Sequence, residues 1–209
     1  MSLRVGSLFA GIGGLDLGLE RAGMTVAWQC EKDDYCTEIL NQHWPHTPVY
    51  DDVRSLYRSP LRGSAYPETP DVLCGGFPCQ DISLAGTGGG LSGERSGLWW
   101  EFDRLIGLLR PRYVLVENVP ALAYRGLDAI CGRLAAYGYD AEWQIVSAAA
   151  VGAPHLRERL FLVAYPSGIG RKQGRIHDRG HDGAESSPNG EHSRTVAYTS
   201  STGREKQNA

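Results

Sequence analysis

The sequence lacks several features that would assign it to a special class of protein. It has no apolar run near the length of about 20 residues that a membrane-spanning helix needs. Its five cysteines include no Cys-x-x-Cys pair, so neither a disulfide framework nor a structural zinc site is indicated. The six histidines show no metal-ligand spacing, and no signal-peptide pattern follows Met1. These absences favour an intracellular protein that has no metal centre and does not enter a membrane.

The composition is that of one ordinary globular domain, but the charge is unevenly spread. Of the 209 residues, 42% are hydrophobic and 22% are charged. Residues 1–165 hold 14 Lys and Arg against 19 Asp and Glu, a formal net charge of -5. Residues 166–209 are polar and rich in Gly, Ser, Arg and His, and cannot bury a core alone. We therefore predict a folded domain over residues 1–165 followed by a polar tail.

Strand-like and helix-like patterns alternate along residues 1–165. Short apolar runs typical of buried strands occupy residues 3–9, 25–28, 71–74, 113–116, 143–146 and 160–164. Helical periodicity lies between them, at residues 15–22, 35–43, 98–109 and 127–137. This alternation predicts an α/β fold with an open, mostly parallel sheet and helices on both faces. In such a sheet, ligands bind beyond the carboxyl ends of the strands.

The junction after the first predicted strand favours a nucleoside-containing cofactor. Its glycine-rich turn lets a ligand approach the backbone closely, and consists of Phe9, Ala10, Gly11, Ile12, Gly13 and Gly14. The third position of a dinucleotide fingerprint is Asp16 and not glycine, so that motif is absent. Glu31, after the second strand, lies where an acid accepts hydrogen bonds from ribose hydroxyls. A plain strand-to-helix turn is the alternative interpretation.

Three further junctions place reactive side chains at the same sheet edge. Cys79 follows Pro78 at the base of a glycine-rich loop, residues 81–96, which we expect to act as a mobile lid. Cys74 lies inside an apolar run and is expected to be a packed core thiol. Glu117 follows the strand at residues 113–116. Each side chain has a structural alternative, a packed thiol or a buried ion pair.

The last junction carries two arginines. Arg157 and Arg159 would point to the same side of an extended segment, although a solvated charge cluster is the structural alternative. Four independent signals at one sheet edge together favour a functional site over four unrelated structural features.

In their order and spacing, these motifs resemble those of the DNA cytosine-5 methyltransferases. The turn at residues 9–14 is similar to the family's S-adenosylmethionine loop, Glu31 to its ribose-binding acid, and Asp52 to the acid that contacts adenine. The run Gly-Phe-Pro-Cys-Gln that contains Cys79 resembles the nucleophile motif, and Glu-Asn-Val, beginning at Glu117, resembles the next catalytic motif.

Arg157 and Arg159 match the end of the family's Gln-x-Arg-x-Arg motif. His155 stands where that motif opens with glutamine. The substitution changes the local hydrogen bonding but keeps both arginines.

The resemblance implies a Rossmann-like fold of the S-adenosylmethionine-dependent methyltransferases and a DNA (cytosine-5-)-methyltransferase activity. A thiolate adds to C6 of a cytosine flipped out of double-stranded DNA, and C5 then takes the methyl group. The implied catalytic residues are Cys79, Glu117, Arg157 and Arg159. The implied cofactor-binding residues are Phe9, Ala10, Gly11, Ile12, Gly13, Gly14, Glu31, Asp52 and Pro78. The reaction needs no metal.

Two side chains are given specific expectations. Glu117 is expected to be buried beside Cys79 when the lid closes. Asp16 has two equally supported interpretations: contact with the methionine part of the cofactor, or a favourable interaction of an acid with the helix dipole. Within residues 98–109, we expect Trp99 in the core and Trp100 on the helix surface.

The chain departs from the family where the catalytic motifs end. Nothing in residues 166–209 resembles a target-recognition domain or the two closing motifs, so this segment is expected to be a disordered tail or the start of a truncated recognition region. The alternatives to an active DNA enzyme are a partner-dependent or inactive fragment and a transfer RNA cytosine-5 methyltransferase. The resemblance suggests two partners, a second chain carrying target recognition and a cognate restriction endonuclease, in the cytoplasm of a bacterium or a phage-infected cell.

Overall fold

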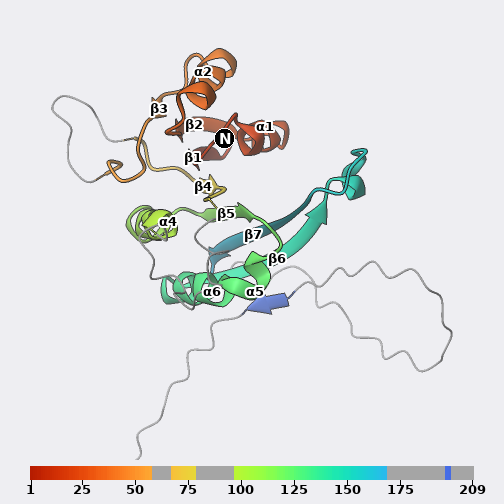
Figure 1. The fold of residues 1–209 in the computed structure, drawn as a ribbon. Coiled ribbons are helices and arrows are strands. Elements are labelled where there is room, and N and C mark those ends of the chain that lie inside the picture. The colour runs from red at the N-terminus through yellow and green to blue at the C-terminus, as the bar shows by residue number, and fades with distance from the viewer. Residues whose placement is uncertain (58–66, 79–96, 169–195, 199–209) are drawn as a thin grey trace, which may run out of the picture.

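The computed structural model describes residues 1–57, 67–78, 97–168 and 196–198, and their elements form one α/β unit (Figure 1). The strands are β1 Arg4–Leu8, β2 Thr25–Cys30, β3 Val49–Tyr50, β4 Val72–Gly75, β5 Tyr113–Asn118, β6 Tyr139–Ser147, β7 Glu158–Pro166 and β8 Val196–Tyr198. The helices are α1 Gly14–Arg21, α2 Asp34–His43, α4 Gly97–Leu109, α5 Leu122–Arg125 and α6 Leu127–Ala136, with a 3-10 turn at Ala149–Val151.

The described strands form a single sheet in the order β3-β2-β1-β4-β5-β7-β6-β8 (Figure 1). The pairs from β3 to β5 are all parallel. This confirms the predicted mostly parallel α/β sheet for the half of the molecule that contains the glycine turn.

The other half of the sheet differs from a purely parallel arrangement. Strand β7 lies between β5 and β6 and is antiparallel to both, with Glu117 opposite Phe161 and Asn118 opposite Leu160. The ten residues between β6 and β7 are too few for the helical crossover that a parallel connection needs, so the two strands form a hairpin. The start of β7 therefore lies at the same edge as the carboxyl end of β5.

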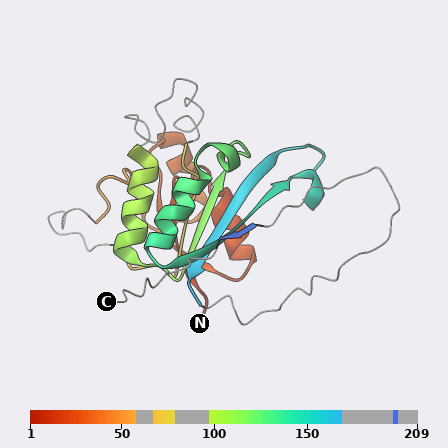
Figure 2. The ribbon, with the colours of Figure 1, turned by 90° about the horizontal axis from the view of Figure 1, so that it is seen from below.

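Helices cover both faces of the sheet (Figure 2). Helices α4 and α6 lie on one face, over the larger core, in which Phe102, Leu105 and Ile106 are fully buried. Helix α1 lies on the other face, where Leu15 and Leu19 pack against Val5, Val72 and Cys74. The alternation of strand side chains between two apolar cores explains why the strand sequences are continuously apolar.

Helix α4 ends where its periodicity predicts, at Leu109, and begins one residue earlier than predicted, at Gly97. Trp99 is 2% exposed and packs against Phe77 and Phe102, whereas Trp100 is 40% exposed. Both tryptophan predictions are confirmed. The short elements β3, α5 and β8 were not predicted, because two to four residues are too few to show a period.

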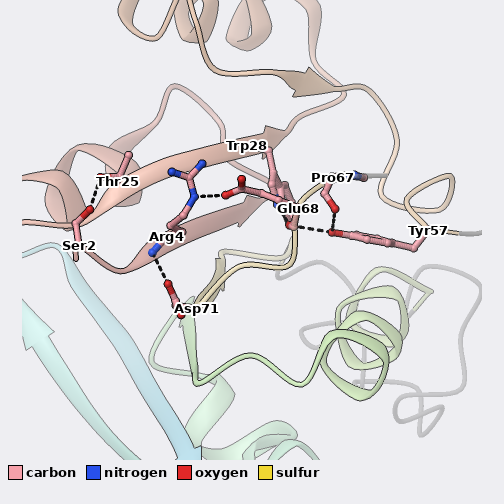
Figure 3. A network of polar contacts seen from close by, with 8 residues as sticks. All are labelled: Ser2, Arg4, Thr25, Trp28, Tyr57, Pro67, Glu68 and Asp71. Atoms are coloured by element: carbon pink, nitrogen blue, oxygen red, sulfur yellow. Dashed lines mark hydrogen bonds and ion pairs between the residues drawn. The ribbon is translucent and has the colours of Figure 1, made fainter. Parts of the chain in front are cut away.

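Polar contacts fix the segment that leads into β4 (Figure 3). The backbone N–H of Arg4 donates to Asp71 Oδ2 at 2.8 Å, and the Arg4 guanidinium pairs with Glu68. Trp28 Nε1 donates to the carbonyl of Glu68 at 2.9 Å, and the Tyr57 hydroxyl donates to the carbonyl of Pro67 at 2.8 Å. These contacts hold the chain against β1 and β2 before it enters the centre of the sheet.

The tail predicted from residue 166 contributes one described element. Strand β8 pairs antiparallel with β6, with Ala141 opposite Tyr198 and Trp143 opposite Val196. The boundary at residue 165 stays a prediction. Among the described helices, none has both the length and the apolarity to cross a membrane.

Candidate active site

The turn between β1 and α1 has an unusual backbone. Phe9, Gly11 and Gly13 have φ values of 53°, 56° and 84°, in the left-handed region that favours glycine. Two reasons exclude a side chain at Gly13: its φ angle is positive, and a Cβ there would lie 2.4 Å from the Trp44 ring. Phe9 holds this conformation without being a glycine, which is typical of residues in functional turns.

Glu31 holds this turn from the end of β2. Its Oε2 accepts a hydrogen bond from the backbone N–H of Gly11 at 2.8 Å. Its Oε1 accepts from the N–H groups of Lys32 and Asp33 at 2.8 and 2.9 Å. A carboxylate has about four acceptor positions, so one position on Oε2 is left for a ligand hydroxyl.

A cavity of about 500 Å³ lies beside the turn, at the carboxyl edge of the parallel strands. Five of the predicted cofactor residues line it: Phe9, Gly11, Glu31, Asp52 and Pro78. Ile12, Gly13 and Gly14 instead line a separate hollow of about 330 Å³ between α1 and α2. Ala10 lies in the turn, where its N–H donates to the carbonyl of Cys30 at 3.2 Å.

Asp52 lines the larger cavity. Its Oδ1 accepts from the backbone N–H of Arg54 at 2.9 Å, and its Oδ2 lies 3.8 Å from Lys32 Nζ. The cavity wall thus combines the carboxylates of Glu31, Asp51 and Asp52 with apolar atoms of Phe9, Val53 and Leu98. A wall that offers both carboxylate acceptors for hydroxyl and amine groups and apolar surface suits a nucleoside, so the residues present fit S-adenosylmethionine.

Glu117 and Arg159 form an ion pair at the far side of this edge. Arg159 Nε lies 2.8 Å from Glu117 Oε1, and the two side chains are 24% and 26% exposed. The other oxygen, Oε2, lies against the backbone of Gly76, where a Cβ would come within 2.6 Å of it. The carboxyl group is half-buried and directed toward the loop that leads into Cys79.

Asn118, next to Glu117, is a positioning residue that sequence reasoning did not single out. It is 3% exposed, its Nδ2 donates to the carbonyl of Phe77 at 3.0 Å, and its Oδ1 accepts from the N–H of Val119 at 2.9 Å. The side chain therefore ties the end of β5 to the residues just before Pro78 and Cys79. Its place inside the Glu-Asn-Val motif was the available signal.

Cys79 and the expected lid at residues 81–96 lie outside the described residues. All four described cysteines are free thiols, and burial raises the pKa of each. The pKa of Cys74, which is fully buried as predicted, rises to about 12, and so does that of Cys30 in the cavity wall. These two thiols stay protonated near neutral pH and are poor nucleophiles.

Arg157 is exposed and lies one residue before β7 begins. Its carbonyl accepts from the N–H of Ala148 at 3.0 Å, which closes the hairpin end. The structure thus brings Arg159 to Glu117 and leaves the Arg157 side chain on the surface of the described part of the chain.

Asp16 does not line either cavity. It is fully buried between α1 and the sheet, where its carboxyl group accepts from Ser7 Oγ and Gln29 Nε2. Neither expectation describes it fully, because it does sit in the first turn of α1 but its hydrogen bonds are to strand side chains. No group of three metal-ligating side chains occurs among the described residues.

Comparison with known proteins assigns the chain to a protein family. The family model for C-5 cytosine-specific DNA methylases matches residues 3–199. The chain belongs to the C-5 cytosine-specific DNA methylases.

Two relatives and one solved structure show how far the similarity to other C-5 methylases extends. The type II methyltransferase M2.BsuMI of Bacillus subtilis is 34% identical over 78% of this chain and 42% of that protein. M.AquIA of Picosynechococcus is 33% identical over 78% of this chain and 72% of that protein. A DNA modification methyltransferase encoded within an Escherichia coli prophage is 31% identical, covers 79% of this chain and 47% of that chain, and has a TM-score of 0.64.

This C-5 methylase thus spans less than half of M2.BsuMI but most of M.AquIA. The similarity to the prophage methyltransferase confirms the Rossmann-like methyltransferase fold. Both curated relatives carry the name type II methyltransferase.

Proposed function

We propose that this chain transfers a methyl group from S-adenosylmethionine to carbon 5 of a cytosine flipped out of double-stranded DNA, through a covalent adduct with Cys79. One observation supports this most directly. The half-buried Glu117 carboxyl group, held by Arg159, faces the Gly76–Pro78 loop, and Gly76 and Pro78 also line the nucleoside-sized cavity. A base held by Glu117 would thus lie next to the cofactor cavity.

Cys79 is the proposed nucleophile. Its thiolate sulfur adds to C6 of the ring, which moves electron density to C5, and C5 then takes the methyl group. Loss of the C5 proton with departure of the Cys79 thiolate restores the aromatic ring. Because burial raises the pKa of Cys30 and of Cys74 to about 12, these two thiols are poor candidates for this step. Asn118 fixes the carbonyl of Phe77, two residues before Cys79, and so positions the loop that carries the nucleophile.

Glu117 and Arg159 act on the base. We propose that the Glu117 carboxyl group binds N3 and the exocyclic amine, which makes C6 more electrophilic; such acid–base assistance is worth about 100- to 10,000-fold. Arg159 orients Glu117 through Oε1 and leaves Oε2 available beside Gly76. Its guanidinium can also donate to the base carbonyl O2. Arg157 would contact the loop of the nucleophile.

The cavity beside the glycine turn would hold the cofactor. S-adenosylmethionine, when bound, supplies the electrophilic methyl group. Glu31 would accept from a ribose hydroxyl at its remaining acceptor position, and Asp52 would accept from the adenine amine. Phe9 and Pro78 would exclude water from the apolar part of the wall. The positive φ angles at Phe9 and Gly11 shape the backbone that the cofactor approaches.

The acidic balance of residues 1–165 supports a partner for target recognition. Affinity for the DNA backbone comes mainly from Lys and Arg contacts with phosphates, and this region carries a net charge of -5. Because the chain spans 42% of M2.BsuMI, we propose that further sequence, on this or a second chain, supplies the surface that reads DNA. A cognate restriction endonuclease and a cytoplasmic location belong to the same proposal.

Trapping tests the chemistry. DNA containing 5-fluorocytosine cannot lose a proton from C5, so the adduct with Cys79 should accumulate in the presence of S-adenosylmethionine and be seen as a mass shift. Cys79→Ala should abolish the adduct, while Cys131→Ala, in a cysteine buried on α6 away from the site, should retain it. An adduct that persists in Cys79→Ala would refute the assignment of Cys79 as the nucleophile.

The same proteins test the substrate and the partner. Tritiated methyl incorporation into duplex DNA and into transfer RNA should favour DNA; preferential RNA labelling would assign the chain to the transfer RNA branch. If the isolated chain methylates duplex DNA as fast as a complete type II enzyme, the partner proposal fails.

A further inference from the structure

Three buried polar side chains meet beneath the glycine turn. Asp16 Oδ2 accepts from Ser7 Oγ at 3.1 Å, and Asp16 Oδ1 accepts from Gln29 Nε2 at 3.0 Å. All three residues are 0% exposed. Ser7 and Gln29 are register partners on β1 and β2, and Asp16 joins them from α1. One carboxyl group thus connects three different elements.

Two members of this cluster lie two residues from a residue of the cofactor cavity, and the third lies two residues from the end of the glycine turn. Ser7 precedes Phe9 by two, Gln29 precedes Glu31 by two, and Asp16 follows Gly14 by two. The cluster therefore fixes both ends of the turn at residues 9–14 and the strand that carries Glu31. Glu31 in turn accepts from the N–H of Gly11, so displacement of either strand end relative to α1 would change the cavity wall.

Burying this polar cluster costs free energy of folding. Burial raises the pKa of Asp16, and the hydrogen bonds from Gln29 and Ser7 offset only part of that effect. The other titratable groups that face Asp16 are Glu20 on α1 and the Cys74 thiol on β4. Gln29 Oε1 has no hydrogen-bond partner within the described part of the chain. An apolar trio of similar volume would avoid these costs.

We propose that Asp16 is a positioning residue for cofactor binding: through Ser7 and Gln29 it holds the 9–14 turn and Glu31 in the arrangement that receives the nucleoside, without touching it. This rests on the proposed function for the identity of the ligand. The arrangement of the turn itself does not depend on that identity.

Two substitutions separate this role from simple loss of a buried group. Asp16→Ala leaves the Ser7 and Gln29 donors without their acceptor. Asp16→Asn keeps an oxygen for Ser7, and its N–H can donate to Gln29 Oε1 once the Gln29 amide turns over, since Nε2 faces Asp16 in the unsubstituted chain. Asp103, 4% exposed and paired with Arg133 at 2.8 Å between α4 and α6, provides a matched control remote from the turn.

The experiment measures the full-length chain by two methods. Hydrogen exchange should show faster exchange at residues 9–14 in Asp16→Ala, with little change there in Asp103→Ala. Calorimetric titration with S-adenosylmethionine should show affinity about tenfold weaker in Asp16→Ala, equal to about 1.4 kcal/mol, and within about threefold of the original in Asp16→Asn.

Each result either supports or overturns a stated part of the proposal. Unchanged exchange at residues 9–14 in Asp16→Ala, relative to Asp103→Ala, overturns the positioning role. Faster exchange with undiminished cofactor affinity overturns its link to the cofactor. Failure of Asp16→Asn to restore the turn shows that the carboxyl group acts only as a structural charge, and also overturns the proposal. If the turn loosens as expected but the unsubstituted chain binds no S-adenosylmethionine, the positioning role stands and the proposed function fails.

Discussion

Asn118 shows how one buried amide fixes a loop to which it does not belong. Its hydrogen bonds to the carbonyl of Phe77 and the N–H of Val119 use both ends of the amide group. Glu31 does the same with a carboxyl group and three backbone amides. At this scale the site is shaped by side chains that bond to the main chain, and each of the two has one partner distant in sequence, Phe77 for Asn118 and Gly11 for Glu31.

Removing the Asn118 amide should affect both stability and chemistry. Asn118→Ala leaves the Phe77 carbonyl without its donor, so the free energy of unfolding should fall by about 1–3 kcal/mol. Adduct formation with 5-fluorocytosine DNA should slow by about tenfold, because the loop before Cys79 loses its anchor. Urea denaturation and the adduct rate measure the two effects. Asn41→Ala, at an exposed position of α2, should change neither; equal effects at both positions would contradict the anchoring role.

Asp16 should give stability a specific pH dependence. Burial raises its pKa above the ordinary 3.8, so the folded chain retains a proton that the unfolded chain has lost. The free energy of unfolding should therefore fall as pH rises from 3.8 through the raised pKa, and Asp16→Asn should lack this component. Urea denaturation of both proteins from about pH 4 to about pH 8 tests the sign. A stability difference that grows in favour of the unsubstituted chain with rising pH would refute it.

The positions of single residues were predictable from the sequence where they depend only on the burial of an apolar side chain. Cys74 and Trp99 lie in apolar periodic patterns and are buried as predicted. Asp16 and Asn118 were not, because a buried polar side chain is recognised by its hydrogen-bond partners, and these come from other elements.

At the scale of elements, the four predicted helices and six predicted strands are all present, and the reversal of β7 is the main difference. Apolar patterning identifies a strand but carries no information on its direction, which depends on the length of the connection. The reversal brings Arg159 to Glu117 from the start of β7. The sequence placed both residues at one sheet edge but did not predict this ion pair.

The loop after β4 should tolerate no side chain at Gly76. A Cβ there would lie 2.6 Å from Glu117 Oε2, so Gly76→Ala should displace the carboxyl group and lower methyl transfer by at least about tenfold, with little loss of stability. Gly132→Ala, on α6, meets nothing within 4 Å and should stabilise the chain by about 0.5–1 kcal/mol. Thermal unfolding and initial rates measure both; full activity in Gly76→Ala would contradict the proposed role of Glu117.

At the scale of the whole molecule, the family match extends to residue 199, and β8 joins the sheet after a polar segment. The sequence predicted the fold through its strand–helix alternation but not β8, because three residues in a polar context show no pattern. Residues 1–165 carry a net negative charge, and the chain spans 42% of M2.BsuMI. Both observations support the proposal that further sequence supplies the DNA-reading surface.

DNA binding by the isolated chain should therefore depend only weakly on salt. Few phosphate contacts give a shallow slope of log affinity against log salt concentration, and we expect a slope no steeper than about -3 for a duplex. Fluorescence anisotropy between about 50 and 200 mM salt measures it. A steeper slope from this chain alone would show that it already carries a full DNA-binding surface.

The hydrogen bonds of Glu31 have a consequence for the thermodynamics of ligand binding. Because its carboxyl group already holds Gly11, Lys32 and Asp33, neither the side chain nor the turn has much conformational freedom left to lose when a ligand enters. The cavity is preorganised at this wall, so the entropic penalty of ordering the protein there is small. Mutations that free Glu31 from these amides would weaken binding through entropy even where the contact with the ligand itself is kept.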